Sequence, residues 1–317
     1  MYWLGIDLGG TNIATGIVDE NYKIIGTGKE KTDCSKGPEK VADDMAIAVE
    51  NAIKDAGIDR NEIVAMGIGS PGAIDPKTGT VLVATNLGFN NVPLCQMMKE
   101  RTGFDFYIEN DANAAAYGEL IAGAGRGKKD FIAITLGTGV GGGIIIDGKI
   151  YSGFNHAGGE LGHTVIVSDG EQCSCGRKGC WEAYASATGL IRQTKAAMLI
   201  NKDSKMWEVS KNIDSVNGIT AFKAMRMGDE TAKSVVKQYI DYVAEGLINM
   251  VNIFQPEVIC IGGGISKEGD TLLDPIKEFA AKNSFTRNLD IKTEYKVAEL
   301  GNDAGIIGAA LLCNLYK

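Results

Sequence analysis

The chain has 317 residues, enough for about two domains, with 44% hydrophobic and 23% charged residues, 42 glycines, two histidines and seven cysteines. A formal net charge of −8 excludes a broad basic surface for nucleic acid, and no apolar run approaches the ~20 residues that cross a bilayer. The N-terminal stretch lacks the basic and apolar regions of a signal peptide. We therefore expect a cytosolic protein with no membrane or nucleic-acid partner, whose cysteines are thiols or metal ligands rather than disulfides.

Strands and helices are predicted in mixed order along the first half of the chain. Apolar runs predict strands at 3–8, 13–18 and 23–28. A helix is predicted from Pro38 to Ala56, because proline favours a helix start and Gly57 favours its end. Further elements are a strand at 63–68, a helix at 93–102, a strand at 104–109, a helix at 112–122, and strands at 131–136 and 142–147.

The second half is predicted to be mainly helical. Helices are expected at about 181–199, 219–227 and 230–253, and a last helix from about 303 to 315. A buried strand at 257–261 lies between them. The alternation of strands and helices, without a long linker, indicates the α/β class.

One segment near the start recurs later at a constant offset of 128 residues. Each copy reads as strand, glycine-rich turn, strand and aspartate. The matching pairs are Ile6 and Ile134, Leu8 and Leu136, Gly9 and Gly137, Ile17 and Ile145, and Asp19 and Asp147. We interpret the pattern as two halves with a related core, each offering a glycine turn to one ligand, since ligand sites tend to form where domains meet. Chance similarity of two glycine hairpins is the alternative.

The first glycine turn reads Asp7-Leu8-Gly9-Gly10-Thr11-Asn12. Adjacent glycines let backbone N–H groups approach a phosphate without a Cβ in the way, and Thr11 and Asn12 add side-chain donors. The Asp7 carboxylate can orient Mg²⁺ or its water, because Mg²⁺ takes oxygen ligands and keeps several waters. An ordinary tight hairpin turn is the alternative for this segment taken alone.

A second glycine-rich segment runs from Leu136 to Gly143. It matches the spacing of the dinucleotide-binding motif, but that motif must open a helix, and the isoleucines at 144–146 predict a strand. A near match to a P-loop also fails, because Ile150 stands where Ser or Thr would bind Mg²⁺. A glycine hairpin that cradles phosphate remains a candidate.

A third glycine segment, Gly262-Gly263-Gly264-Ile265-Ser266, follows the predicted buried strand at 257–261. Three consecutive glycines offer nearly flat backbone on which a ring can lie. A plain strand-to-helix turn is the alternative.

Three thiols, those of Cys173, Cys175 and Cys180, lie within eight residues, and two intervening glycines permit a tight knuckle. Structural Zn²⁺ takes four Cys or His ligands in a tetrahedron. His163 is the preferred fourth ligand because Gly162 frees its backbone. His156 is the other candidate, and a metal-free thiol cluster is a third interpretation. Three thiolates and an imidazole leave no open position, so this zinc would be structural.

Asn110 and Asp111 stand where a predicted strand ends and a helix begins. Either residue could be only a helix N-cap. A strand-end carboxylate opposite a phosphate loop can, however, take a proton from an attacking hydroxyl, and phosphoryl transfer needs little more than positioning, Mg²⁺ and charge stabilisation.

Two glutamates lie close to the predicted metal ligands. Glu160 has glycines on both sides, and Glu182 follows Cys180 by two residues. Zinc would hold these carboxylates and His163 in one wall, and polyol substrates suit carboxylates because each hydroxyl can donate to them. A first-turn helix acid is the alternative for Glu182.

Together these motifs resemble the sugar kinases of the ROK family, and within it the bacterial glucokinases. The resemblance covers about residues 5–266 and is most specific at the cysteine knuckle with its upstream histidine. The matching segments are Gly5–Thr11, Gly69–Gly72, Glu109–Ala114, Leu136–Gly143, Glu160–His163, Cys173–Glu182 and Gly262–Ser266.

The resemblance implies an actin-like (ribonuclease H-like) α/β fold with two related domains and an ATP cleft between them. Residues 1–118 with 301–317 would form the N-terminal domain, closed by the C-terminal helix. Residues 119–300 would form the C-terminal domain with the zinc knuckle.

The resemblance also implies a set of site residues. The catalytic base would be Asp111. Sugar contacts would be Ser70, Pro71, Gly72, Asn86, Asn110, Asp111, Glu160, His163 and Glu182. Phosphate contacts would be Gly9, Gly10, Thr11, Asn12, Thr138 and Gly139, with Gly263 and Gly264 facing adenosine. The zinc ligands would be His163, Cys173, Cys175 and Cys180.

The implied activity is phosphorylation of the glucose 6-hydroxyl by ATP with Mg²⁺, and a homodimer is the family expectation. Another hexose or an N-acetylhexosamine is an alternative substrate (mannose, fructose, N-acetylglucosamine or N-acetylmannosamine), since few pocket contacts set such specificity. A sugar-responsive repressor would need a helix-turn-helix ahead of a first strand that begins at about residue 3. A non-catalytic sugar sensor would lack the base or a phosphate loop, and both are present.

Overall fold

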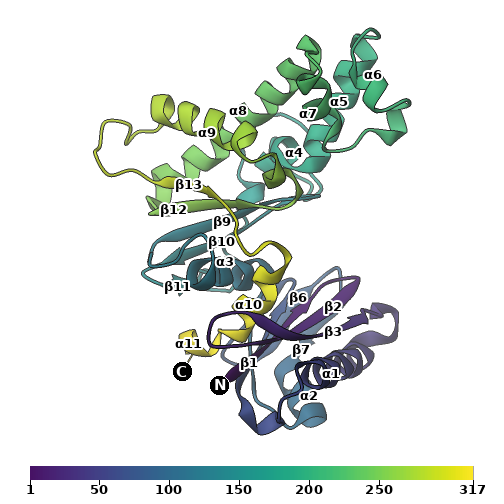
Figure 1. Ribbon diagram of the computed structural model, residues 1–317, viewed down its shortest axis with the longest axis vertical. Coiled ribbons are helices and arrows are strands. Elements are labelled where there is room, and N and C mark those ends of the chain that lie inside the picture. Colours follow the sequence, from purple (N-terminus) through teal and green to yellow (C-terminus); the bar gives the residue numbers. More distant parts are fainter. Residues whose placement is uncertain (317) are drawn as a thin grey trace. The chain divides into compact units, whose positions relative to one another are not determined.

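The computed structural model describes residues 1–316, which form two compact units (Figure 1). The first unit contains Met1–Ile132, Gly143–Gly159 and the segment from Glu299 onward. The second unit contains Ala133–Gly142 and Glu160–Ala298.

A five-stranded sheet forms the centre of the first unit. Its strands are β1 (Tyr2–Leu8), β2 (Asn12–Val18), β3 (Ile24–Lys31), β4 (Ile63–Ser70) and β8 (Phe106–Asn110). The order is β3-β2-β1-β4-β8, with antiparallel pairing from β3 to β1 and parallel pairing from β1 to β8. All five strands are predicted by the sequence, although β3 extends three residues beyond its predicted end.

Helix α1 (Gly37–Ala56) packs directly on β3. A Cβ at Gly28 would lie 1.9 Å from the carbonyl oxygen of Ala48, so only glycine allows this approach of helix to strand. The helix ends at Gly57, whose φ of 67° is the left-handed conformation that favours glycine. The predicted helix and its end residue are therefore confirmed.

Three short strands that the sequence analysis did not predict form a small antiparallel sheet. They are β5 (Ala73–Asp75), β6 (Thr80–Ala84) and β7 (Phe89–Val92), in the order β5-β6-β7. Helix α2 (Leu94–Thr102) follows, as predicted, and lies beside α1 (Figure 1).

The end of the chain returns to the first unit. The predicted single helix at 303–315 is wrong, because a turn at Leu311 and Leu312 separates α10 (Ala304–Ala310) from α11 (Cys313–Tyr316). Helix α10 packs on α3 (Asp111–Ala122) and on β1. A Cβ at Gly308 would lie 1.7 Å from the carbonyl oxygen of Ala114, so the two helix backbones touch.

The second sheet repeats the strand order of the first. Its strands are β9 (Phe131–Leu136), β10 (Val140–Ile146), β11 (Lys149–Ile150), β12 (Val258–Gly262) and β13 (Glu294–Val297), and their order is β11-β10-β9-β12-β13. As in the first sheet, one outer pair is antiparallel and the other parallel. This correspondence confirms the related cores inferred from the 128-residue offset.

The predicted helix at 181–199 is wrong as a single element. Ser186 is extended and separates α4 (Trp181–Ala185) from α5 (Ala187–Ile200). Its hydroxyl accepts a hydrogen bond from the backbone N–H of Gly189 at 3.0 Å, which caps α5. The change of direction places the first residues of α5 beside the turn after β9, where Ala187 N donates to Gly137 O.

The remaining helices of the second unit surround its long helix, α8 (Glu230–Phe254). Trp181 is fully buried against α8, where a Cβ at Gly246 would lie 2.0 Å from the indole ring. Helices α7 (Thr220–Arg226) and α8 are confirmed; α6 (Met206–Val209) and α9 (Asp270–Asn283), like β11 and β13, were not predicted. Figure 1 shows α9 beside α8.

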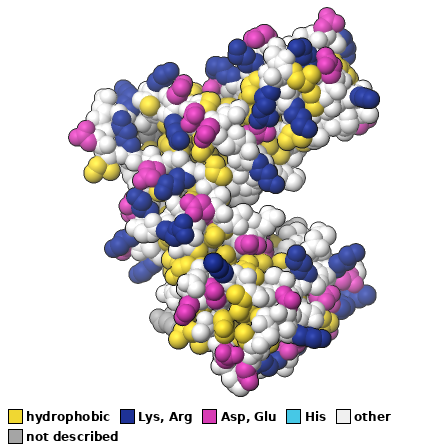
Figure 2. Space-filling view, in the orientation of Figure 1, with side chains coloured by type: hydrophobic (Ala, Val, Ile, Leu, Met, Phe, Trp, Pro, Cys, Tyr) yellow, Lys and Arg dark blue, Asp and Glu magenta, His cyan; other side chains and the backbone are white. Residues whose placement is uncertain are grey.

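Charged side chains of both signs are intermixed over the visible face in Figure 2. Within residues 1–316, no helix is both long and apolar enough to cross a membrane. The domain boundaries implied by the resemblance, 1–118 with 301–317 and 119–300, stay a prediction.

Candidate active site and metal centre

The predicted site residues are distributed between the two units. The first unit carries Asp7, Gly9, Gly10, Thr11, Asn12, Ser70, Pro71, Gly72, Asn86, Asn110 and Asp111. The second carries Thr138, Gly139, Glu160, His163, Cys173, Cys175, Cys180, Glu182, Gly263 and Gly264. Each set is described below within its own unit.

The turn between β1 and β2 is exposed at its tip and fixed at its base. The Gly9 N–H donates to the Asn12 carbonyl at 2.9 Å, and the Thr32 hydroxyl donates to the Gly9 carbonyl at 2.7 Å. Gly10 and Thr11 are exposed. A short, anchored turn with an exposed glycine backbone suits contact with a phosphate.

Asn110 ends β8 and caps α3. Its side-chain oxygen accepts hydrogen bonds from the N–H groups of Ala112 at 2.9 Å and Asn113 at 3.2 Å. Its amide nitrogen donates to the Gly72 carbonyl at 3.1 Å, which ties the turn after β4 to the start of α3. Asn110 is therefore the N-cap, and the Asp111 carboxylate is not needed for that task.

Asp111 is the first residue of α3 and lies near Asp7 of β1. Gly69 lies on the intervening strand β4, and a Cβ there would be 3.3 Å from Ala114 Cβ and 3.5 Å from Asp111 Cα, so the start of α3 packs closely on this strand. One Asp111 oxygen accepts a hydrogen bond from the Ala112 N–H at 2.9 Å. The two carboxylates thus share the end of the sheet where β1, β4 and β8 finish.

Burial disfavours the charge on both carboxylates. Burial, with a smaller contribution from the negative Asp111, raises the pKa of Asp7 from 3.8 to about 6. Burial also raises the pKa of Asp111, against the opposing effect of its hydrogen bonds. A base works best when its pKa lies near the operating pH, and these shifts are in that direction.

The turn Ser70-Pro71-Gly72 is rigid for steric reasons. Ser70 is fully buried, and Gly72 has a φ of 98° and a Cβ position only 2.0 Å from the Val83 carbonyl oxygen. Asn86 is exposed and lies beside the first glycine turn, since a Cβ at Gly10 would be 3.5 Å from its Nδ2. The structure therefore brings Asn86 next to a residue predicted to contact phosphate.

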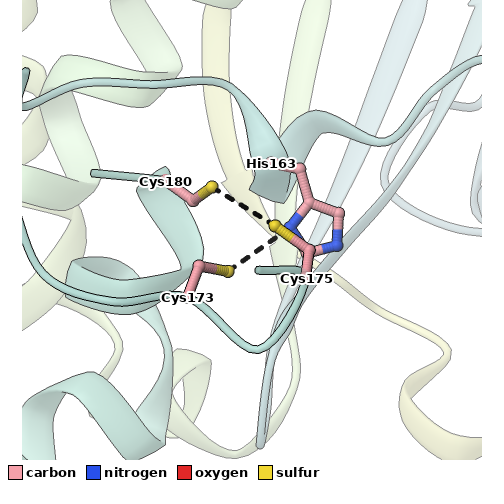
Figure 3. Close-up of side chains that lie close together, drawn as sticks. All are labelled: His163, Cys173, Cys175 and Cys180. Atoms are coloured by element: carbon pink, nitrogen blue, oxygen red, sulfur yellow. Dashed lines mark hydrogen bonds between the residues drawn. The ribbon is translucent and has the colours of Figure 1, made fainter. Parts of the chain in front are cut away.

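In the second unit, the side chains of His163, Cys173, Cys175 and Cys180 converge (Figure 3). Their ligand atoms all lie within 4.8 Å of one another. Cys173 Sγ is 3.6 Å from His163 Nδ1, and Cys175 Sγ is 3.7 Å from Cys180 Sγ. A tetrahedral zinc with ~2.3 Å bonds to sulfur and ~2.05 Å to nitrogen has ligand separations of about 3.6 Å (S to N) and 3.8 Å (S to S).

This donor set fits a four-coordinate Zn²⁺, as the spacing of the thiols predicts. Figure 3 shows the second ring nitrogen of His163 on the side away from the sulfur atoms. Gly162 is required because a Cβ there would lie 2.3 Å from the Val140 carbonyl oxygen. Backbone freedom, the reason given from the sequence, is not the cause, because Gly162 is not among the positive-φ glycines.

His156, the other histidine, is not part of this cluster. Its Nε2 lies 3.8 Å from Asp75 Oδ1, and its Nδ1 lies 3.5 Å from the Ser152 hydroxyl. All three residues belong to the first unit. The choice left open by the sequence is therefore decided in favour of His163 as the residue that joins the thiols.

Glu182 joins the cysteine knuckle to the turn between β9 and β10. One carboxylate oxygen accepts a hydrogen bond from the Ser174 hydroxyl at 3.0 Å, and the other accepts one from the Val140 N–H at 3.0 Å. Glu182 also lies in the first turn of α4. It is therefore both a first-turn helix acid and the acceptor of these two hydrogen bonds. Glu160 is exposed and precedes the short helix that carries His163.

The turn Gly137-Thr138-Gly139 is held by the first residues of α5. The Thr188 hydroxyl donates to the Thr138 carbonyl at 2.8 Å. Thr138 and Gly139 line a cavity of about 470 Å³. The other lining residues are Gln172, Cys173, Ser174, Glu182, Ala183, Ser186, Thr188, Gly189 and Arg192.

The third glycine segment lies against the base of this turn. Gly263 has a φ of 85°, and a Cβ there would lie 2.4 Å from the Leu136 carbonyl oxygen. Gly264 begins a short 3₁₀ helix, so the segment is also a strand-to-helix turn. Its proposed contact with adenosine stays a prediction.

Two residues with clear structural roles were missed by the sequence analysis. Glu109 is a buried acid bonded to Asn110 and Asn113, and Ser174 orients Glu182. Glu109 precedes Asn110, and Ser174 lies between Cys173 and Cys175, so their position next to predicted site residues was the available indication in the sequence.

Comparison with known proteins identifies the family. The model of the ROK family matches residues 3–315. The chain belongs to the ROK family. It is 38% identical to a glucokinase from Halalkalibacterium halodurans, over 98% of this chain and 94% of that protein.

A solved structure shows the same fold. The ROK family glucokinase from Streptomyces griseus, in complex with glucose and AMPPNP, matches with a TM-score of 0.79 and 37% identity, over 98% of this chain and 99% of that one. The predicted α/β, actin-like class is therefore confirmed. A xylose repressor from Caldicellulosiruptor bescii is 32% identical over 96% of this chain and 76% of its own length.

Proposed function

We propose that this protein is a glucokinase that transfers the γ-phosphoryl group of ATP to the 6-hydroxyl of glucose. The observation that carries the proposal is the half-buried pair Asp7 and Asp111 at the end of the first sheet, both with raised pKa values. It occurs in a chain that resembles glucokinases over nearly its whole length.

Asp111 accepts the proton of the 6-hydroxyl as that oxygen attacks phosphorus in line. Its place at the start of α3 is fixed by Asn110, so the carboxylate is free of the capping task. Burial raises the pKa of Asp111, which makes it a stronger base than an exposed aspartate.

Backbone and side-chain donors of Gly9, Gly10, Thr11, Asn12, Thr138 and Gly139 would bind phosphate oxygens. Asp7 would hold Mg²⁺ or its water, since Mg²⁺ takes carboxylate oxygens as ligands. Mg²⁺ would neutralise the charge on the transferring group. Gly263 and Gly264 would lie against adenosine.

Hydroxyls of the sugar would bind carboxylates and amides of this chain. The residues proposed for this role are Ser70, Pro71, Gly72, Asn86, Asn110, Asp111, Glu160, His163 and Glu182. Zn²⁺ on His163 and the three cysteines would be structural, because four protein ligands leave no open position. It would fix the imidazole so that its second nitrogen can meet a hydroxyl.

The Asp111→Asn variant tests the base. The amide cannot accept the proton, so kcat should fall by at least ~100-fold while glucose still binds. Asp105→Asn is the matched control, because Asp105 is exposed and pairs with Lys99 at the surface. Near-wild-type turnover by Asp111→Asn would contradict the assignment.

Sugar specificity is tested separately. A coupled assay for ADP should give the highest kcat/KM with glucose among glucose, mannose, fructose, N-acetylglucosamine and N-acetylmannosamine. A higher value for another sugar would reassign the substrate and leave the phosphoryl-transfer chemistry in place.

We further propose a cytoplasmic location and a homodimer. ATP as the substrate and cysteines in the thiol form support the first. The family expectation supports the second, and sedimentation of the purified chain would measure it.

A further inference from the structure

Glu109, the residue before the Asn110–Asp111 pair, is a carboxylate almost completely removed from solvent. It is 2% exposed at the end of β8. One oxygen accepts hydrogen bonds from the Asn110 N–H at 2.8 Å and the Asn113 side-chain amide at 3.1 Å. Buried carboxylates are costly unless several donors satisfy them, so this arrangement requires each of its partners.

The second oxygen of Glu109 takes its donor from a distant part of the chain. The hydroxyl of Tyr316, in α11, lies 2.5 Å from Glu109 Oε2. The Tyr316 ring stacks on Tyr107, at 6.4 Å between centroids and 17° between planes. Burial and the adjacent Glu109 carboxylate raise the pKa of Tyr316 well above its usual value, so the hydroxyl remains a donor.

These contacts involve residues on both sides of Asp111 in the sequence. Glu109 binds the backbone of Asn110, which precedes Asp111, and the side chain of Asn113, which is in the same first turn of α3. Asn110 in turn caps α3 through the N–H groups of Ala112 and Asn113. A shift of Glu109 would therefore move both residues that set the position of the Asp111 carboxylate.

We propose that Glu109 and Tyr316 are positioning residues for Asp111, with α11 supplying the hydroxyl that locks the buried carboxylate. This inference rests on the proposed kinase activity. A base must be held closely to its working geometry, and a displacement of about 1 Å far from the chemistry can cost about 100-fold in rate.

A purely structural role makes a different prediction. Loss of a buried hydrogen bond would then lower the melting temperature, while the folded enzyme would turn over at the wild-type rate. A positioning role lowers kcat of the folded enzyme and leaves the KM values for glucose and ATP nearly unchanged, because the loss appears mainly in the transition state.

Tyr316→Phe removes the donor and keeps the ring and its stacking. We expect kcat to fall about 3- to 10-fold at a temperature where the variant is fully folded, with both KM values within about twofold of wild type. Tyr107→Phe is the matched control. Tyr107 belongs to the same ring stack, but the hydroxyl that donates to Glu109 Oε2 is that of Tyr316. The control variant should retain wild-type kcat.

Glu109→Gln places an amide opposite donor groups and should lower kcat by about 10- to 100-fold. The double variant Glu109→Gln with Tyr316→Phe should be no slower than Glu109→Gln alone, because both changes break the same contact. Wild-type kcat in folded Tyr316→Phe, or additive losses in the double variant, would overturn the inference. Absence of kinase activity in the wild-type protein would instead overturn the proposed function.

Discussion

The side chain of Asp7 is held where its charge is disfavoured. Burial and the neighbouring Asp111 raise its pKa from 3.8 to about 6, so the folded chain binds this proton more tightly than the unfolded chain does. The carboxylate therefore contributes a destabilising term once it is ionised. Such terms are tolerated where function requires a buried charge.

The sign of this effect gives a pH prediction. As pH rises from about 4 to 6, ionisation of Asp7 should lower the free energy of unfolding, and the deficit should be constant above that window. Asp7→Asn should remove the deficit and stabilise the protein at pH 8 by up to about 3 kcal/mol. Urea unfolding between pH 4 and 8 measures the difference.

Asp19 provides a control of opposite sign. Its oxygen accepts hydrogen bonds from the N–H groups of Asn21 and Lys23, and the bond from Lys23 is the main cause that lowers its pKa. Asp19→Asn should therefore lose stability above the unfolded pKa. If Asp7→Asn and Asp19→Asn changed the free energy of unfolding at pH 8 in the same direction, the raised pKa assigned to Asp7 would be contradicted.

Local residue patterns predicted some of the site and could not predict the rest. The spacing of three thiols, together with His163, indicates a metal set because its members are close in sequence. The contact between Tyr316 and Glu109 joins residues 207 positions apart, and no local sequence pattern predicts it. Glu182 was predicted from its place after Cys180, but its bond to Val140 N depends on how α4 approaches β10.

At the scale of elements, the contact between α3 and α10 depends on glycine. A Cβ at Gly118 would lie 2.4 Å from the Ala304 carbonyl oxygen, and one at Gly308 would lie 1.7 Å from that of Ala114. These positions let two helix backbones touch, which places the segment leading to α11 beside β1 and β4.

Gly308→Ala should therefore force the helices apart. We expect a loss of about 3 kcal/mol or more of unfolding free energy, at the upper end of the range for overpacked cores. Gly141→Ala is the control, because no atom lies within 4 Å of its Cβ position and its φ is not positive. That variant should be neutral or slightly stabilised. Equal melting temperatures for the two variants would contradict the close helix contact.

The predicted element boundaries were wrong where tertiary contacts interrupt a sequence with helical periodicity. Residues 181–199 carry a continuous helical pattern, yet Ser186 is extended and α5 starts anew against the turn at Gly137. The small sheet was missed because β5, β6 and β7 are only three, five and four residues long. Strands of that length give too few alternations to reveal a period.

At the scale of the whole molecule, the two related sheets carry different functional groups. The first unit places the carboxylate pair at the end of its sheet, and the second carries the cysteine knuckle beside the turn after β9. The repeated strand order was predictable because the offset of 128 residues preserves both apolar and glycine positions. The knuckle has no counterpart at that offset in the first half.

The metal should therefore stabilise one unit selectively. The knuckle from Cys173 to Cys180 contains turns and isolated bridges rather than a helix or strand. Its backbone bonds include Cys173 N to Arg177 O at 2.9 Å and Gly179 N to Glu171 O at 2.8 Å. Zn²⁺ bound by its thiols is therefore expected to contribute strongly to its folding. Cys175→Ser should lose the one zinc per chain that metal analysis is expected to find in the wild type. Hydrogen–deuterium exchange should then become at least ~10-fold faster across residues 161–182, while exchange in β1 and β4 stays unchanged.

Cys95→Ser is the control for this experiment, because burial raises the pKa of that thiol to about 12 and it lies in the first unit. It should retain the metal. Full zinc content in Cys175→Ser would refute the ligand set. Faster exchange spread evenly over both units would refute a stabilising role confined to the knuckle, since the contacts that close it all lie in the second unit.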